Sequence, residues 1–186
     1  MTKIAIVLGS IRDGRVSPQV GEWVKEIGNK RENVEFEIVD LKEFEMPLFY
    51  KRFSEYDGTE KEYENLKRLS EITQNVDGFV FITPEYNHGL TSVMKNYFDL
   101  FYAEFNNKAA GIVSYGSSMG ARAGEQVRNI LAELQVADVR QQVSLSLFAD
   151  FEGFVNFKPL DIQEGGLETM LDQVVAWTDA LAHLRK

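Results

Sequence analysis

The sequence predicts an α/β fold in which a parallel sheet is covered by helices on both faces. Short apolar runs, such as residues 3–8, have the near-continuous hydrophobicity of strands that are buried on both sides. These runs alternate along the chain with segments whose apolar residues recur at helical spacing. Five strands separated by helices in this way favour parallel pairing, because each crossover helix returns the chain to the same edge of the sheet.

The first half of the chain contains two of the predicted strands and two helices. After the strand at residues 3–8, Ser17 and Pro18 predict a helix start, since serine is a good N-cap and proline suits the first turn. This helix ends at Gly28-Asn29, and residues 34–41 alternate like a strand with one wetter face. Thr59 and Glu62 form a capping-box pattern before a helix with apolar residues at Tyr63, Leu66, Leu69 and Ile72.

The second half repeats the alternation. Strands are predicted at residues 79–83, 109–115 and 139–147, and a helix at about residues 92–101. A further helix carries Val127, Ile130, Leu131 and Leu134, and the last helix begins near Gly166. Residues 1–186 are therefore expected to form one domain of ordinary size.

Composition excludes several classes of function. The net charge of −9 argues against binding nucleic acid or anionic membranes, both of which need a basic surface. The chain has no cysteine, which excludes disulfides, thiol nucleophiles, thiolate zinc and cysteine-ligated clusters, and we predict no metal site. The apolar runs are too short for a membrane span, and residues 1–8 do not resemble a secretory signal, so a cytoplasmic location is expected.

In parallel sheets, ligands bind beyond the carboxyl ends of the strands, so three loops attract attention. The loop at residues 9–17 joins a buried strand to a helix N-terminus, a natural position for an anion. Ser10 and Ser17 offer hydroxyls, and Arg12 and Arg15 can bind phosphate oxygens. The loop matches neither the dinucleotide-binding nor the NTPase glycine pattern. The alternative is that Ser17 only caps the helix and both arginines are solvated.

The second loop follows the strand at residues 79–83. Pro84 should end the strand, Tyr86 supplies a flat ring, and Asn87 supplies a hydrogen-bond donor and acceptor. Such a turn suits a flat heterocycle with polar edges. Taken alone, the loop is equally typical of a proline-terminated strand with a surface tyrosine.

The third loop, residues 114–120, is rich in small residues that allow close approach of a ligand. It also contains the G-x-S-x-G pattern of hydrolases, with Ser118 at the nucleophile position. A serine nucleophile needs a histidine base, and the chain has only His88 and His183. His183 follows Ser118 as the hydrolase order requires, but it lies on the amphipathic terminal helix. A serine hydrolase is therefore a minor hypothesis, and we predict no catalytic side chain.

Three motifs together resemble one family: Gly9-Ser10-Ile11-Arg12, Pro84-Glu85-Tyr86-Asn87-His88 and Ser114-Tyr115-Gly116. The chain resembles the NADPH-dependent FMN reductases, which include flavin, quinone, azo-dye and chromate reductases. The resemblance implies a flavodoxin-like three-layer sandwich with strand order 2-1-3-4-5 and a bound FMN. It also implies a homodimer, or a tetramer, with active sites at the subunit interface.

The resemblance also implies roles for individual residues. The phosphate of FMN is assigned to Ser10, Arg12, Arg15, Val16 and Ser17. The isoalloxazine is assigned to Pro84, Glu85, Tyr86 and Asn87, and its pyrimidine side to Ser114, Tyr115, Gly116 and Ser117. Two departures affect these assignments. Arg15 stands where many members have serine, and Gly89-Leu90-Thr91-Ser92 replaces the usual Ser-Ile-Pro-Gly after His88.

The implied activity is transfer of a hydride from NADPH or NADH through FMN to a small-molecule acceptor by a ping-pong mechanism. An alternative is a flavodoxin-like electron carrier without reductase activity, and another is a flavin-binding partner protein that senses redox state. Two segments, residues 44–56 and 148–157, are rich in aromatic side chains. We expect at least one of them to pack on a second subunit near the flavin, the alternative being ordinary core packing.

Overall fold

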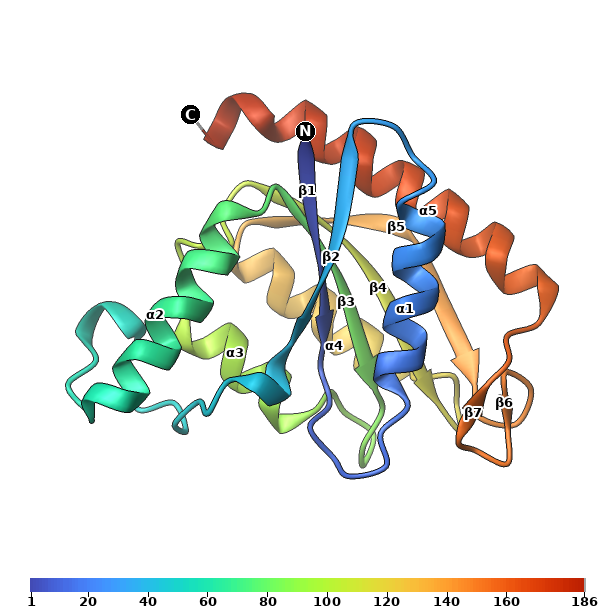
Figure 1. Cartoon of the computed structure of the whole chain (residues 1–186), viewed down its shortest axis with the longest axis horizontal. Helices are drawn as coiled ribbons and strands as arrows, with labels where there is room; N and C mark the ends of the chain where they lie inside the picture. Colours follow the sequence, from blue (N-terminus) through green and yellow to red (C-terminus); the bar gives the residue numbers. More distant parts are fainter. Residues whose placement is uncertain (186) are drawn as a thin grey trace.

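A computed structural model describes residues 1–185 and contains a five-stranded parallel sheet (Figure 1). The strands are β1 (Thr2–Leu8), β2 (Val34–Asp40), β3 (Gly78–Pro84), β4 (Lys108–Gly116) and β5 (Val136–Ser146). Their order is β2-β1-β3-β4-β5, which confirms the order implied by the family resemblance. Every residue of β3 and β4 is buried, whereas the edge strands β2 and β5 alternate in exposure. This difference explains the apolar runs of the central strands.

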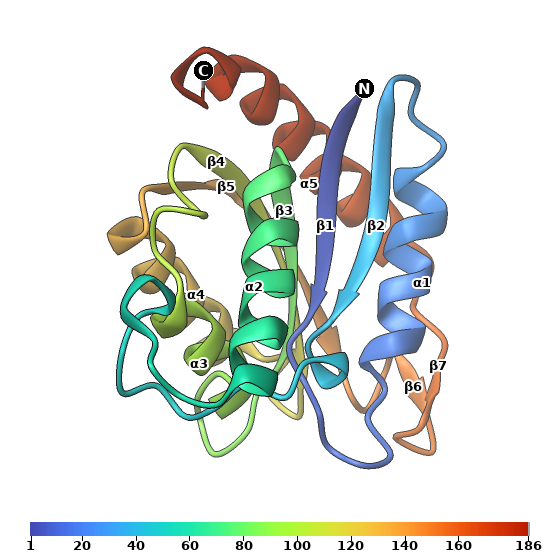
Figure 2. The same ribbon diagram turned by 60° about the vertical axis from the view of Figure 1, so that its left-hand side comes forward.

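Helices cover both faces of the sheet, as expected (Figure 2). On one face lie α1 (Ser17–Gly28) and α5 (Asp161–Leu181), whose buried residues share a core with β1 and β5. On the other face lie α2 (Glu60–Asn75), α3 (Ser92–Leu100) and α4 (Ala121–Glu133). The three-layer arrangement is thereby confirmed.

The local sequence signals predict the N-cap of α2 correctly and the N-cap of α1 incorrectly. The capping box of α2 is present, since the Glu62 N–H donates to Thr59 Oγ1 and the Thr59 N–H donates to the Glu62 carboxylate. Ser17, in contrast, does not cap α1, because Val16 holds the cap position and Ser17 is already helical. The Ser17 side chain is fully buried and caps no helix N–H, so the prediction of a serine cap is wrong.

The segment between β5 and the last helix also differs from the prediction. It contains a short antiparallel hairpin, β6 (Phe151–Glu152) with β7 (Asn156–Phe157), that the sequence pattern did not reveal. The helix α5 then begins at Asp161 rather than near Gly166. Its first turn carries Asp161 and Glu164, whose negative charges favour a helix N-terminus, and the two following glycines lie within the helix.

The topology brings four connections together at one end of the sheet, where the strands have their carboxyl ends. The loops after β1, β3 and β4 and the β6–β7 hairpin gather at the carboxyl ends of the strands, at the bottom of Figure 1. The chain passes tightly at Gly9, whose N–H donates to Ile82 O (2.8 Å) and whose carbonyl accepts from Thr91 Oγ1 (2.5 Å). A Cβ there would lie 2.9 Å from Ile82 O, so only glycine allows this passage. Within residues 1–185, no helix is both long and apolar enough to cross a bilayer.

Candidate functional site

The loops at this edge surround a pocket of about 280 Å³. Eight of its lining residues are among those predicted from the three motifs: Arg12, Arg15, Val16, Pro84, Glu85, Tyr86, Tyr115 and Gly116. Two further lining residues, Leu147 and Phe154, were not predicted. A signal for them existed, because both follow β5, whose carboxyl end meets the same edge, and Phe154 belongs to the aromatic segment 148–157.

Arg15 is held by an ion pair rather than pointing freely into the pocket. Its guanidinium binds both carboxylate oxygens of Asp40, the last residue of β2, one of them at 2.6 Å. It also donates to the carbonyl of Ser10 at 2.6 Å. Burial alone raises the Asp40 pKa, but the Arg15 guanidinium and the Lys42 N–H outweigh burial and lower it. The charge of Arg15 is therefore neutralised by Asp40, and this ion pair fixes the conformation of the loop after β1.

Arg12 keeps its charge available at the mouth of the pocket. Its side chain is exposed, and its guanidinium carbon lies 5.8 Å from the centre of the Tyr86 ring. Tyr86 is tied to the same loop, since its hydroxyl and Ser10 Oγ share a hydrogen bond of 2.9 Å. The loops after β1 and β3 are thus joined beside an exposed cation, which is the group best placed to meet an anion.

Two buried hydroxyls beside the pocket lack partners. Ser17 Oγ and Tyr115 Oη are both inaccessible to solvent, and neither makes a hydrogen bond to any residue within 1–185. Burial, and then the nearby Tyr86, raise the Tyr115 pKa, while the Ser17 hydroxyl opposes this shift. The Ser17 hydroxyl is therefore near Tyr115 without meeting the geometry of a hydrogen bond. Unpaired buried hydroxyls at a helix N-terminus indicate a place for an oxygen-rich ligand.

The loop after β3 is a tight turn. Tyr86 and Gly89 exchange backbone hydrogen bonds of 3.0 and 3.1 Å, and Asn87 and His88 between them have φ of 51° and 65°. Gln126 on α4 holds the turn by accepting from the Leu90 N–H and donating to His88 O. The turn is thus closed by its own backbone and by Gln126, with Gly89-Leu90-Thr91-Ser92 following His88.

Glu85 faces the neighbouring helix. Its carboxylate accepts from the Arg122 N–H at 2.9 Å and from the Arg122 guanidinium at 2.5 Å, at the first turn of α4. Desolvation raises the Glu85 pKa, but these bonds and the Ala123 N–H outweigh it, and the pKa is lowered. The side chain therefore fastens the loop after β3 to α4 and leaves backbone groups to line the pocket.

The loop after β4 uses its serines differently. Ser114 Oγ is buried, donates to Met119 O and accepts from Gln142, so it stabilises the loop through hydrogen bonds inside the protein. Ser117 is exposed. Gly120 has φ of +66°, and a Cβ there would lie 2.6 Å from Tyr115 N, so the turn into α4 requires glycine.

The arrangement separates the residues of a serine hydrolase. Ser118 lies in the loop beyond the carboxyl end of β4. His183 lies in the turn after α5, beside Arg185, which bonds to Asp77 and Asn107 just before β3 and β4 begin. The serine and this histidine therefore lie at opposite ends of the strands, so His183 cannot act as the base for Ser118.

Comparison with known proteins shows the family of this chain. The family model of the NADPH-dependent FMN reductases matches residues 2–150. A Schizosaccharomyces pombe protein named NAD(P)H-dependent FMN reductase is 30% identical over 185 residues, covering 99% of this chain and 86% of that protein. This chain belongs to the NADPH-dependent FMN reductase family. A similarly named Saccharomyces cerevisiae protein is 31% identical over 149 residues, covering 72% of this chain and 75% of its own.

Solved structures support the fold of this FMN reductase family member. The Paracoccus denitrificans flavoenzyme NAD(P)H:(acceptor) oxidoreductase superposes with a TM-score of 0.74 at 17% identity, over 97% of this chain and 98% of that one. The residues also suit the cofactor in the family name. FMN combines a phosphate with a flat ring, and the pocket combines an exposed arginine and unpaired hydroxyls with Tyr86 and a tight turn.

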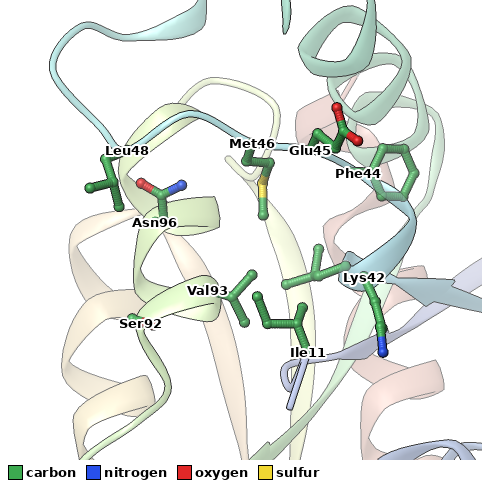
Figure 3. A pocket seen from close by; sticks show the side chains of 10 residues that line it. Ile11, Lys42, Phe44, Glu45, Met46, Leu48, Ser92, Val93 and Asn96 are labelled. Atoms are coloured by element: carbon green, nitrogen blue, oxygen red, sulfur yellow. The ribbon is translucent and has the colours of Figure 1, made fainter. Parts of the chain in front are cut away.

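A second cavity of about 340 Å³ lies on the other side of the loop after β1 in this reductase (Figure 3). Ile11, Met46 and Val93 point toward its centre, and the charged Lys42 and Glu45 also line it. Asn96 on α3 accepts from the Phe49 N–H and donates to Pro47 O, each at 2.8 Å, which fixes the segment that borders the cavity. The cavity borders the first turn of α3 at Ser92 and Val93, but its lining within residues 1–185 contains no arginine and no buried hydroxyl without a partner, so the first pocket is the candidate active site.

Proposed function

We propose that this protein is an FMN-dependent NAD(P)H oxidoreductase that reduces a small-molecule acceptor. The observation that carries the proposal is the pair of unpartnered hydroxyls, Ser17 and Tyr115, buried beside the N-terminus of α1. A phosphate placed there would accept from these hydroxyls and from the Ser17 N–H, since Pro18 has no N–H and those of Gln19 and Val20 donate to Val16 O. Family membership and the pocket supply the remaining support.

The proposal divides the predicted residues by task. Arg12 and Ser17 bind the phosphate directly, while Arg15 and Ser10 shape the loop through Asp40 and Tyr86. The backbone of residues 84–87 and the loop at residues 114–117 hold the flat ring. Ser114 and the Glu85 side chain act from behind these loops, because their own hydrogen bonds are already made within the chain.

Bound FMN would supply two-electron chemistry, taking a hydride from NAD(P)H and delivering the electrons to an acceptor. The chain's part is to hold the ring in place and to donate hydrogen bonds where negative charge develops, for which the backbone N–H groups of the Gly116 loop are suited. We propose that the nicotinamide and the acceptor enter in turn, in a ping-pong sequence, which is the order that membership of the FMN reductase family suggests.

The proposal also covers the class of electron acceptor, the oligomeric state and the location of the protein. Quinones, azo dyes, free flavins and chromate are the acceptor classes that the family suggests. A homodimer, or a tetramer, is proposed because exposed aromatic residues lie on the two segments that flank the site. A cytoplasmic location is proposed from the acidic, cysteine-free composition.

The test is spectroscopic. The purified protein, loaded with FMN if necessary, should show the absorbance of oxidised flavin. Under anaerobic conditions, one equivalent of NADPH or NADH should bleach this absorbance without any acceptor present, and a quinone should restore it. Separate half-reactions of this kind define a ping-pong mechanism.

Two results would overturn the proposal. A protein that refuses added FMN would remove the cofactor from the pocket. A protein that binds FMN but oxidises neither NADPH nor NADH, and that holds a stable one-electron-reduced flavin, would instead be an electron carrier.

A further inference from the structure

The hairpin between β5 and α5 is firmly attached to the body of the protein. Asp150, which is 1% exposed, accepts from the N–H groups of Ser146 (2.7 Å) and Leu160 (3.0 Å), at the two ends of the connection. Gln19 on α1 donates to Val155 O and accepts from the Phe157 N–H, each at 2.8 Å. The hairpin tip is therefore held beside the N-terminus of α1.

The tip carries a phenylalanine in an unfavourable backbone conformation. Gly153 and Phe154 have φ of +60° and +64°, and the Val155 N–H donates to Glu152 O at 3.3 Å. Positive φ at both central residues is the type I′ arrangement, which favours asparagine or glycine at both positions. A bulky aromatic residue in this conformation is strained, and such strain persists only where surrounding structure enforces it.

Core packing does not account for this phenylalanine. The side chain of Phe154 is 56% exposed, and its neighbour Phe148, which meets it edge to face at 5.6 Å between ring centres, is 71% exposed. Burial of Phe151, at 5% exposure, already anchors the hairpin. Phe154 thus adds strain, and the exposed pair adds apolar surface, without adding to the core.

Phe154 does, however, line the candidate FMN pocket, together with Arg12, Val16 and Tyr115. We propose that Phe154 is a ligand-contacting residue that forms an aromatic wall against bound FMN, with Phe148 supporting it from outside. The inference rests on the proposed function and extends it, since the family motifs lie in the loops after β1, β3 and β4 and do not include this hairpin. FMN would cover the ring that is otherwise half exposed, and this burial would offset the strain of the turn.

The proposal predicts that one substitution raises the stability of the FMN-free protein and weakens its binding of FMN, and the two effects can be measured separately. Phe154→Asn should raise the thermal midpoint of the FMN-free protein by about 2–4 °C, because asparagine tolerates positive φ. The same change should raise the Kd for FMN about five- to tenfold, measured by the quenching of flavin fluorescence. Phe154→Trp keeps an aromatic wall and should leave the Kd within about twofold.

Val155→Ala is the matched control. Val155 lies in the same turn and is 54% exposed, but it does not line the pocket. Its replacement should leave the Kd for FMN unchanged. A weaker Kd in Phe154→Asn with a normal Kd in Val155→Ala and Phe154→Trp would support the wall.

Other outcomes overturn it. An unchanged Kd in Phe154→Asn means that Phe154 does not touch FMN. A weaker Kd with a lower thermal midpoint of the FMN-free protein means that Phe154 packs structurally. A change in sedimentation of Phe154→Asn means that the tip contacts a second copy of the chain. If the wild-type protein itself binds no FMN, the proposed function fails, which is distinct from wild-type binding that the substitution leaves intact.

Discussion

At the scale of single residues, the two unpaired hydroxyls make the FMN-free site costly. An unpaired buried polar group destabilises a protein by about 1–3 kcal/mol. Ser17→Ala and Tyr115→Phe should therefore raise the stability of the FMN-free protein by about 1 kcal/mol each, in denaturant unfolding. Both should also weaken FMN binding, since each removes a donor to the proposed phosphate.

Thr178 is the natural control for this prediction. Its hydroxyl is also buried without a partner within residues 1–185, but it lies on α5 against Gly78, at the opposite edge of the sheet. Thr178→Val should raise stability in the same way and leave the Kd for FMN unchanged. Equal FMN affinity in all three variants would remove Ser17 and Tyr115 from the phosphate site.

The two arginines of the loop after β1 should behave differently when removed. Arg12→Ala should raise the Kd for FMN by tenfold or more with little change in the thermal midpoint of the FMN-free protein, because its charge is exposed and uncommitted. Arg15→Ala should mainly lower that midpoint, because it leaves the partly buried Asp40 carboxylate unpaired. Calorimetry and flavin fluorescence would measure both quantities. Unchanged FMN retention in Arg12→Ala would contradict its role.

Lys108 makes stability depend on pH far from the pocket. The residue is 4% exposed, and its ammonium donates to Gln74 O and, more closely, to Thr73 O at the end of α2. Burial, with Arg185 nearby, lowers its pKa from 10.5 to about 8. Between these two values the unfolded chain keeps a proton that the folded protein has lost, so the free energy of unfolding rises with pH.

The expected rise is about 1 kcal/mol between pH 7 and 9, a range in which tyrosines of ordinary pKa stay mostly protonated. Urea unfolding at several pH values would measure it. Lys108→Met should lack the rise while remaining folded. A flat profile in the wild-type protein would show that the ammonium stays protonated in the folded state.

At the scale of elements, Glu85 couples the loop after β3 to the start of α4. Glu85→Gln should lower the thermal midpoint at pH 7 by about 2–4 °C, because a neutral amide binds the helix N-terminus and Arg122 less strongly. The Glu85 pKa is lowered in the folded protein, so its contribution is present above its unfolded pKa and is lost as pH falls through the folded value. Calorimetry should therefore show the two midpoints converging in acid. A constant difference would mean that the charge is irrelevant.

Elements with strong periodicity could be predicted from the sequence, and short ones could not. The five sheet strands, the capping box at Thr59 and the strand order, through the family motifs, all agree with the structure. The β6–β7 hairpin has two residues in each strand, too few to show alternation, and its turn uses Gly153-Phe154 rather than a recognisable turn pair. The early start of α5 was hidden by Gly165 and Gly166, which tertiary packing accommodates within the helix.

For the site, the sequence predicted which residues come together, but not which partners their side chains bind. The motifs predicted which loops meet, but hydrogen bonding decides what each side chain can do there. Arg15 and Glu85 both carry the expected charge, and each is committed to a partner distant in sequence, Asp40 or Arg122. A single sequence cannot show such pairing, because the partners lie on other elements and become neighbours only when the sheet assembles.

At the scale of the whole molecule, the remaining prediction is association into a homodimer. The segment at residues 44–56 borders the second cavity, and its Leu48 and Phe49 are 81% and 45% exposed. Exposed apolar residues gathered around a cavity are typical of a contact surface. We expect a second subunit to cover them, since this segment lies next to the loop after β1 and therefore near the proposed FMN site.

Leu48→Glu tests this arrangement, because a carboxylate cannot be buried there without a large cost. Sedimentation velocity should give twice 21.2 kDa, about 42 kDa, for the wild-type protein and a shift toward 21.2 kDa for the variant. Ile162→Glu, at a residue that is 78% exposed on the first turn of α5, should leave the dimer intact. A wild-type protein of monomeric mass would contradict the dimer, and a dimer that resists Leu48→Glu would place its interface on another surface, with the hairpin tip at Phe154 as the next to test.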